Sequence, residues 1–231
     1  MLKEEFKDYL MQELNLELSE KQLSDFETYA DFLLEYNQKV NLTAITELSD
    51  VYDKHFIDSI MVLRMVRFKD ESLADIGTGA GFPGIPLKIA CPDLKLTLIE
   101  PTGKRCVFLK ETVDRLGLKD VRIIQARAED LKERECYDYV TARAVANLNI
   151  LSELCTPLLK VNGKFIVLRG SSGLEEIKQA ESAFKKLHLK QEMIDEFTYL
   201  DNQRVNALFV KSKATPSRYP RNYSQIKKDP L

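Results

Sequence analysis

With 231 residues, of which 44% are hydrophobic, the chain is long enough for one well-buried core and a smaller appendage rather than two full-sized domains. It has no run near the roughly 18 apolar residues of a membrane span, and its first six residues are too acidic for a secretory signal, so we expect a soluble, cytoplasmic protein. The net charge of −2 does not indicate a polyanion partner, and four scattered cysteines without a Cys-x-x-Cys pair predict neither structural zinc nor a disulfide framework.

Charge is distributed unevenly along the chain. Residues 1–50 hold four lysines against twelve acidic residues, a net charge of −8, whereas residues 211–231 hold six basic residues against Asp229, a net charge of +5. A short basic tail on a neutral body can contact phosphates, although a solvated terminus has the same composition.

The N-terminal third is expected to be helical. Apolar residues recur at spacings of three and four within 23–34, after a Ser-x-x-Gln capping box at residues 19–22, and Asn37 marks the end of this helix. A second helix is expected over 49–63. No strand pattern appears before Ser72, so we expect residues 1–70 to form a helical region.

Strands alternate with helices in the next part of the chain. Short apolar or β-branched runs, separated by helix-like sequence, occupy residues 73–76, 94–99, 121–124, 137–141 and 165–168. Such alternation implies right-handed crossovers and a mostly parallel, doubly wound α/β sheet covered on both faces.

The end of this α/β domain has a different pattern. A helix is expected over 173–187, followed by two strands, 192–199 and 205–210, with only a polar turn between them. An antiparallel pair that ends a parallel sheet is typical of the class I S-adenosylmethionine (SAM)-dependent methyltransferase fold, and a plain dinucleotide-binding domain usually lacks it. We expect this domain to span residues 71–212 and the basic tail to span 213–231.

A glycine-rich loop follows the first predicted strand. It reads Asp75-Ile-Gly77-Thr-Gly79-Ala-Gly81-Phe82-Pro-Gly84 and leads into a helix. Glycines let the backbone approach a ligand closely, and a helix start offers free N–H groups. The loop also satisfies the dinucleotide pattern G-x-G-x-x-G, so by itself it does not choose between cofactors.

Acidic residues after the second and third predicted strands bear on the choice of cofactor, and the segment after the third strand favours SAM. Glu100 ends the second predicted strand, where a carboxylate can accept the ribose hydroxyls of either cofactor. After the third strand, residues 126–130 (Ala-Arg-Ala-Glu-Asp) can surround an adenine edge with backbone amides and a carboxylate, as is typical of methyltransferases. A dinucleotide site and a purely structural glycine turn remain the alternatives.

The reaction class is narrowed by motifs that the chain lacks. Adenine amino methylation commonly uses Asn or Asp before Pro-Pro-aromatic after the fourth strand, where this chain has Thr141–Val145. Cytosine C5 methylation needs a thiolate, normally in a Pro-Cys setting, but Cys91 precedes its proline. Guanine N7 carries a lone pair and no proton, so its methylation requires alignment rather than a base. The residues permit this reaction without requiring it.

Several longer motifs run nearly end to end through the chain. They are Asn41-Leu-Thr43, His55-Phe-Ile-Asp58-Ser59, the loop from Asp75 to Pro86, Gly103-Lys-Arg105 with Phe108-Leu109, Arg127-Ala-Glu129, Thr141-Ala-Arg143-Ala144, Arg169-Gly170 and Arg218-Tyr-Pro-Arg221. With these motifs the chain resembles the bacterial small-subunit ribosomal RNA guanine-N7 methyltransferases, called RsmG and formerly GidB.

The resemblance implies which residues form the site. Gly77, Phe82, Ala128, Glu129 and Arg143 would contact the cofactor, with Arg143 also bordering the target base as the catalytic residue. Gly79 and Glu100 complete the predicted cofactor set, and no metal is expected. The implied substrate is a guanine in the decoding region of 16S ribosomal RNA. The chain departs from the family where Glu100-Pro101 replaces the more usual Asp-Ser, and its tail has fewer prolines and glycines.

Five basic residues are candidates for RNA contact. Lys104 and Arg105 open a helix beyond Glu100, Arg169 follows the fifth strand, and Arg218 and Arg221 flank an aromatic residue. Each could equally be a solvated surface residue, and the motif residues His55 and Asp58 could contact RNA or pair with each other.

We expect the partner to be 16S ribosomal RNA or a small ribosomal subunit, bound by a monomer. A non-catalytic ribosome assembly factor that retains a SAM site is the alternative function.

Overall fold

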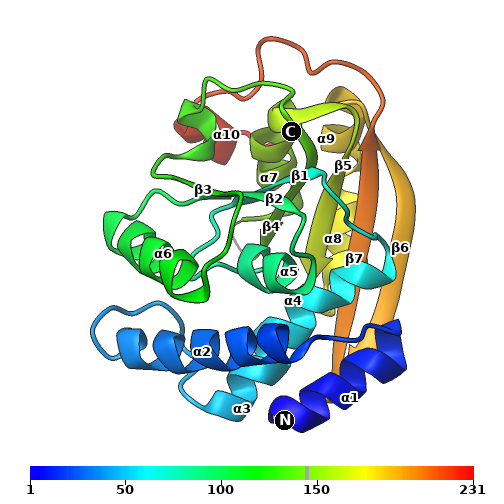
Figure 1. Ribbon diagram of the computed structural model, residues 1–231. Helices are drawn as coiled ribbons and strands as arrows, with labels where there is room; N and C mark the ends of the chain where they lie inside the picture. The colour runs from blue at the N-terminus through cyan, green and yellow to red at the C-terminus, as the bar shows by residue number, and fades with distance from the viewer. Residues whose placement is uncertain (144–145) are drawn as a thin grey trace.

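The computed structural model describes residues 1–143 and 146–231, and a seven-stranded sheet forms its centre (Figure 1). The strands are β1 (Ser72–Ile76), β2 (Lys95–Ile99), β3 (Val121–Ile124), β4 (Tyr137–Arg143), β5 (Leu159–Arg169), β6 (Leu189–Tyr199) and β7 (Asn202–Lys211). They lie in the order β3-β2-β1-β4-β5-β7-β6. The first five pair in parallel, whereas β7 is antiparallel to both β5 and β6. This order confirms the predicted sheet with its terminal antiparallel hairpin.

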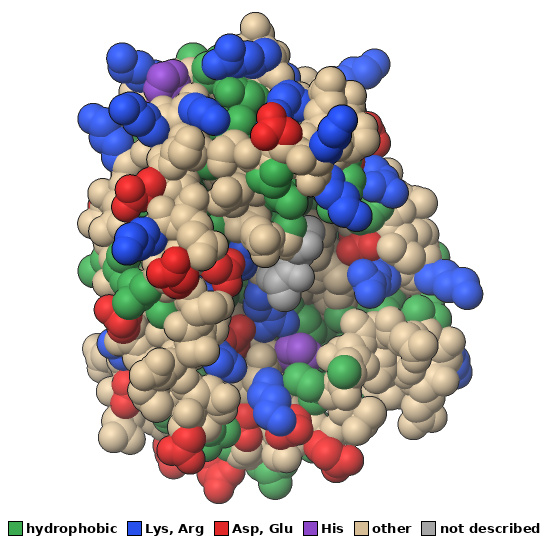
Figure 2. All heavy atoms as spheres, turned by 180° about the vertical axis from the view of Figure 1, so that it is seen from behind, with side chains coloured by type: hydrophobic (Ala, Val, Ile, Leu, Met, Phe, Trp, Pro, Cys, Tyr) green, Lys and Arg blue, Asp and Glu red, His purple; other side chains and the backbone are tan. Residues whose placement is uncertain are grey.

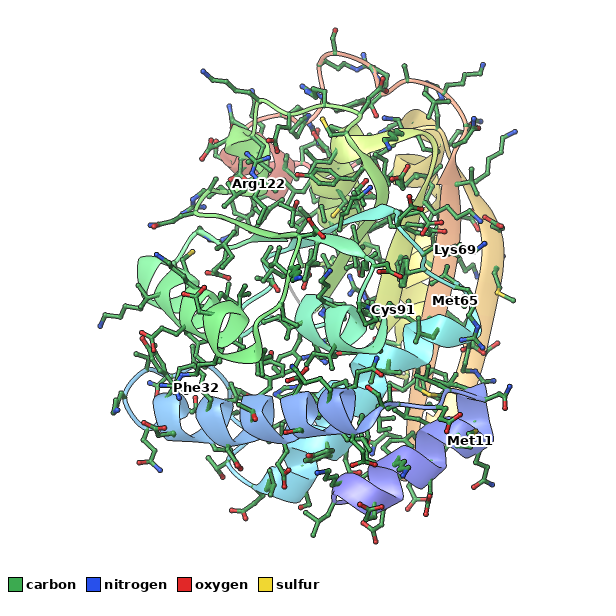
Figure 3. All side chains as sticks on the ribbon, in the orientation of Figure 1. Met11, Phe32, Met65, Lys69, Cys91 and Arg122 are labelled. Atoms are coloured by element: carbon green, nitrogen blue, oxygen red, sulfur yellow. The ribbon has the colours of Figure 1, made fainter. Side chains whose placement is uncertain are left out.

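Helices cover both faces of the sheet. One face is covered by α1 (Lys3–Leu14), α2 (Glu20–Asn37), α5 (Gly84–Ala90) and α6 (Gly103–Leu116), and the other by α7 (Leu148–Cys155), α8 (Gly173–Gln179), α9 (Glu181–Lys186) and α10 (Tyr223–Lys228). Alternate residues of β5 serve the two layers: Ile166 and Leu168 pack with the first set of helices, Phe165 and Val167 with the second. In Figure 3, the labelled Phe32 lies between α2 and α6, where its ring stacks on Phe108 at 5.2 Å.

The N-terminal helical region is part of the main hydrophobic core. The predicted capping box is present, because Ser19 N–H donates to Gln22 Oε1 at 2.9 Å and Gln22 N–H to Ser19 Oγ at 3.3 Å. Phe6, Phe26 and Phe56 from three helical segments form one aromatic cluster that continues to the sheet. Within the residues that the structure describes, no helix could span a membrane.

The second predicted helix is a continuous run of four segments. These are α3 (Leu48–Val51), the π-helical η1 (Tyr52–Ile57), α4 (Asp58–Ile60) and the 3-10 segment η2 (Met61–Arg64). π-Helical turns are rare and frequently occur at functional sites. His55 lies inside this one.

Three elements differ from the sequence-based expectation. The crossover between β3 and β4 contains only a 3-10 turn, η3 (Ala128–Asp130), because residues 125–136 are mostly charged and have no apolar period. A second 3-10 turn, η4 (Thr156–Leu158), leads into β5, which begins before the predicted residue 165 because its first residues are mostly exposed. The helix predicted over 173–187 is divided into α8 and α9 at the buried Ala180.

Candidate functional site

A cavity of about 470 Å³ opens at the carboxyl edge of β1, β2 and β4, and we call it the first cavity. Its walls come from the glycine loop, the end of β2, the loop after β3 and the end of β4. All seven predicted cofactor residues line it: Gly77, Gly79, Phe82, Glu100, Ala128, Glu129 and Arg143. The topology therefore brings together residues that are far apart in the sequence.

The glycine loop is held close to α2. Tyr29 on α2 is buried, and its hydroxyl donates to the carbonyl of Ala80 at 2.5 Å. A Cβ at Gly81 would lie 2.8 Å from the Tyr29 hydroxyl, and the φ of Gly81 is 104°, so a larger residue would push helix and loop apart. Burial raises the pKa of Tyr29 well above its usual value, which keeps the hydroxyl available as a donor.

Asp75 closes the loop from behind. Its Oδ2 accepts from Thr78 Oγ1 at 2.6 Å and from the Gly84 N–H at 2.9 Å, so one carboxylate joins both ends of the loop. Asp75 is fully buried, and its Oδ1 has no hydrogen-bond partner within the described residues. Burial raises the pKa of Asp75 from 3.8 to about 7, although the hydrogen bonds from Thr78 and Gly84 oppose this rise.

Glu100 is prepared to accept further hydrogen bonds. Its carboxylate accepts the N–H of Gly79 at 3.1 Å and of Thr102 at 2.9 Å, and the side chain is 2% exposed. A carboxylate offers about four acceptor sites, so about two remain for hydroxyl groups in the cavity. Pro101 has no N–H, but the next residue supplies one. The Glu-Pro sequence therefore still places a carboxylate with free acceptor positions in the first cavity.

Arg143, at the end of β4, is fixed by the N-terminal helical region. Its Nη1 donates to Asp58 Oδ2 at 3.0 Å, and its Nη2 donates to His55 Nδ1 at 3.0 Å. The guanidinium carbon lies 4.9 Å from the centre of the Phe82 ring. Arg204 on β7 donates to the other oxygen of Asp58 at 2.8 Å. His55 and Asp58 thus bind Arg143, and they do not pair with each other as one hypothesis supposed.

His55 is a neutral ring in a fixed tautomer. Because arginine can only donate, His55 Nδ1 must accept, which places the ring proton on Nε2, 2.9 Å from Thr43 Oγ1. The ring stacks on Phe82 with centroids 4.2 Å apart. Burial and the Arg143 guanidinium lower the pKa of His55 from 6.5 to about 3. The Asn-Leu-Thr motif therefore serves to orient this histidine.

A second cavity, of about 340 Å³, lies on the other side of Arg143. It is lined by Lys54, His55, Asp58, Arg143, Leu168, Arg169, Gly170 and Arg204. Figure 2 shows a histidine and several basic side chains beside a hollow on the rear face of the molecule. Arg143 and His55 line both cavities, so they form part of the wall between them.

Three of the arginines predicted to contact RNA also make contacts within the protein. Arg169 is buried and donates to Glu176 at 2.9 Å and to the carbonyl groups of residues 146 and 168. Arg221 pairs with the buried Glu153 at 2.6 Å. Arg105 lines the first cavity, 3.8 Å from Glu100.

The other two RNA candidates are exposed. Lys104 has no ion pair with any described residue, and Arg218 stacks over Tyr219 at 5.0 Å. Ala144 of the Thr-Ala-Arg-Ala motif lies outside the described residues.

Sequence reasoning missed several residues of the first cavity. Leu42, Thr43 and His55 come from the N-terminal region, Leu154 from α7 and Tyr223 from α10. The motifs at residues 41–43 and 55–59 marked the first three as noteworthy without assigning them a place, whereas no sequence signal distinguished Leu154 or Tyr223.

The first cavity fits SAM. Its volume lies within the roughly 300–1,000 Å³ typical of small-ligand sites, and its polar groups match the cofactor's ends. Glu100 offers free acceptor positions, the glycine loop allows a close approach to the backbone, and Ile99, Ala128 and Leu154 offer apolar surface for a purine.

Comparison with known structures supports this fold. The structure of M. jannaschii TYW2 in complex with AdoMet superposes with a TM-score of 0.56 at 18% identity, covering 67% of this chain and 75% of that chain. A SAM-dependent methyltransferase from Aquifex aeolicus superposes with a TM-score of 0.56 at 15% identity, covering 77% and 98%. The chain therefore has the fold of SAM-dependent methyltransferases.

Sequence comparison identifies the family. The model of the GidB family, described as rRNA small subunit methyltransferase G, matches residues 22–205. The ribosomal RNA small subunit methyltransferase G of Lysinibacillus sphaericus is 44% identical, over 94% of both chains. That of Lactobacillus johnsonii is 45% identical, over 93% of this chain and 94% of its own. Residues of the predicted motifs line the first cavity. These comparisons show that this chain belongs to the GidB family of SAM-dependent small-subunit ribosomal RNA methyltransferases.

Proposed function

We propose that the protein transfers the methyl group of SAM to N7 of a guanine near the decoding region of 16S ribosomal RNA, in the cytoplasm. The wall that Arg143 and His55 form between the two cavities is the observation that carries this proposal. The first cavity would hold the cofactor, and the second would receive the guanine with its adjoining phosphates.

The chemistry requires no catalytic base. SAM supplies an electrophilic methyl group on its sulfonium. With SAM bound in the first cavity, the N7 lone pair would take this methyl group as the carbon–sulfur bond breaks, which would leave a neutral thioether and a positively charged methylated base without any proton transfer. His55 is unsuited to act as a base, because its pKa is far below neutrality and its Nδ1 is occupied by Arg143.

Arg143 is suited to orient the base. A guanidinium can donate to guanine O6 and stack on a base plane, and its pKa is too high for it to act as a general base. Asp58, His55 and the Phe82 ring fix its position from three sides. Alignment by such a preorganised group can supply much of the acceleration when no proton transfer is needed.

The second cavity suits an anionic substrate. Lys54, Arg143, Arg169 and Arg204 line it, against the single carboxylate of Asp58, which is shared between Arg143 and Arg204. An excess of cations around a small cavity favours a nucleotide and its phosphates.

Methyl transfer to small-subunit particles that lack the modification tests the proposal. With methyl-labelled SAM, the purified protein should place label in 16S ribosomal RNA, recovered as 7-methylguanosine. Binding of the particles and of S-adenosylhomocysteine without any label in RNA would support the non-catalytic assembly factor instead. Saturable NAD binding without S-adenosylhomocysteine binding would indicate an oxidoreductase.

A further inference from the structure

The basic C-terminal segment, residues 213–231, is folded against the rest of the protein. Tyr219 and Ile226 are buried in the hydrophobic cluster that contains α7, and α10 packs against α7 near the loop with η3 (Figure 1). Asn222 Oδ1 accepts the Gln225 N–H at 3.0 Å and caps α10. This segment is thus an ordered element, although its composition also suited a solvated tail.

Arg221 anchors the segment to α7. Glu153 on α7 is fully buried, and its carboxylate receives Arg221 Nε at 2.9 Å, Nη2 at 2.6 Å and the Arg221 backbone N–H at 2.8 Å. A buried carboxylate is costly without such partners. Arg134 adds a second tether by donating to the carbonyl of Tyr219. Docking of the tail therefore satisfies a charge in the core of the domain.

Two residues beyond this anchor, Tyr223 reaches the first cavity. It lines the cavity together with Leu154 and residues 126–129. The helix α7 contacts both α10 and η3, so these three segments meet at one end of the cavity. This is the end assigned to the adenine ring, where an aromatic side chain can cover the face or edge of a purine.

We propose that the C-terminal segment completes the cofactor site: Tyr223 forms a wall at the adenine end, and the Arg221–Glu153 pair holds it there. The proposal rests on the assignment of the first cavity to SAM. If Tyr223 contacts the adenine ring, docking of the C-terminal segment strengthens cofactor binding, and bound cofactor in turn stabilises the docked segment.

Calorimetric titration of the full chain with S-adenosylhomocysteine tests whether Tyr223 contacts the bound cofactor. Tyr223→Ala should weaken binding about tenfold, the usual scale for losing an aromatic contact to a base. Tyr223→Phe retains the ring, and Lys227→Ala changes an exposed side chain on the same helix, so both should bind like the wild type. Wild-type affinity in Tyr223→Ala would overturn the proposal.

A second ligand tests whether Tyr223 contacts the adenine end of the cofactor or its amino-acid end. 5′-Methylthioadenosine has the adenine and ribose but lacks the amino-acid end, so Tyr223→Ala should weaken its binding by the same factor. A loss confined to S-adenosylhomocysteine would contradict placement at the adenine end.

Hydrogen exchange tests the coupling without any substitution. S-Adenosylhomocysteine should slow exchange of the α10 amides in the wild type, and unchanged exchange at saturating ligand would contradict the coupling. If the wild type binds neither ligand, the cofactor assignment itself fails, and this outcome is distinct from failure of Tyr223 alone.

Discussion

Arg143 interacts with two protein segments that meet only in the folded chain, and its loss should therefore separate catalysis from folding. Arg143→Ala removes the group that faces both cavities, and it leaves Asp58 paired with Arg204. Single-turnover methylation at saturating cofactor and RNA should fall about a hundredfold, the scale of lost alignment. Arg143→Lys should recover little, because the planar fork is lost.

A thermal melt is the control for this prediction. If Arg143 is only a brace between β4 and the helical region, the alanine variant will melt at a lower temperature and retain its saturated rate. That result would remove Arg143 from the catalytic assignment.

Replacing Glu100 should weaken binding of the cofactor and leave RNA binding nearly unchanged. Glu100→Ala removes the acceptor that Gly79 and Thr102 hold in the first cavity. Affinity for S-adenosylhomocysteine, measured by calorimetry, should fall by about 1–3 kcal/mol, while RNA affinity should barely change. Collapse of RNA binding with normal cofactor affinity would show that Glu100 has been misassigned.

The part of the site that lies at or shortly after strand ends could be predicted from the sequence. Gly77, Glu100 and Ala128 follow strand ends, and parallel strands bring such ends to one edge. The link between His55 and Arg143 joins residues 88 positions apart through a crossing of helix and sheet. No local pattern specifies such a contact.

Helix α2 supports the glycine loop through the buried hydroxyl group of Tyr29. Tyr29→Phe would leave the Ala80 carbonyl without its partner in a buried setting. The free energy of unfolding should drop by about 1–3 kcal/mol in urea titrations. Tyr36→Phe on the same helix is the control, since the Tyr36 hydroxyl has no hydrogen-bond partner in the described ranges. Equal loss in both variants would contradict the role given to Tyr29.

The closure of the same loop by Asp75 should depend on pH. Burial raises the pKa of Asp75 from 3.8 to about 7, so the folded protein binds more protons than the unfolded chain between these values. This group's contribution to stability is therefore complete below about pH 4 and is lost as the pH rises towards 7. Asp75→Asn keeps an oxygen acceptor for Thr78 and Gly84 but cannot ionise.

Melting temperatures across this range measure the effect. The stability of Asp75→Asn relative to the wild type should increase as the pH rises from about 4 to 7. A constant difference between the two proteins across that range would show that Asp75 titrates normally.

Elements with a strong apolar period could be predicted, and those without one could not. Strands β1, β2 and β4 and helix α2 have runs of buried side chains, whereas the first residues of β5 are mostly exposed. The crossover after β3 is polar, as the exposed face of a helix would be, but it lacks the apolar period of a helix. It forms the short turn η3, which lines the first cavity. Loop geometry at a ligand site thus replaced the expected helix.

The net charge of −2 does not show where the basic residues lie in the folded protein. Several basic residues of the sequence motifs surround the second cavity or serve as internal braces, as Arg169 and Arg221 do. The tail's charge could be read from composition, but its docking depends on Glu153, a buried carboxylate whose burial the sequence does not reveal. The acidic N-terminal region likewise contributes Thr43, from the loop after α2, and His55, from η1, to the first cavity.

We propose that a SAM site and a guanine site lie on either side of Arg143, where the protein methylates small-subunit RNA. Mass spectrometry of nucleosides and RNA fragments from 16S ribosomal RNA, with and without the gene, tests it most directly. One 7-methylguanosine near the decoding region should disappear without the gene and return with the wild-type protein but not with Arg143→Ala. An unchanged 7-methylguanosine content in cells without the gene would show that the protein does not make this modification.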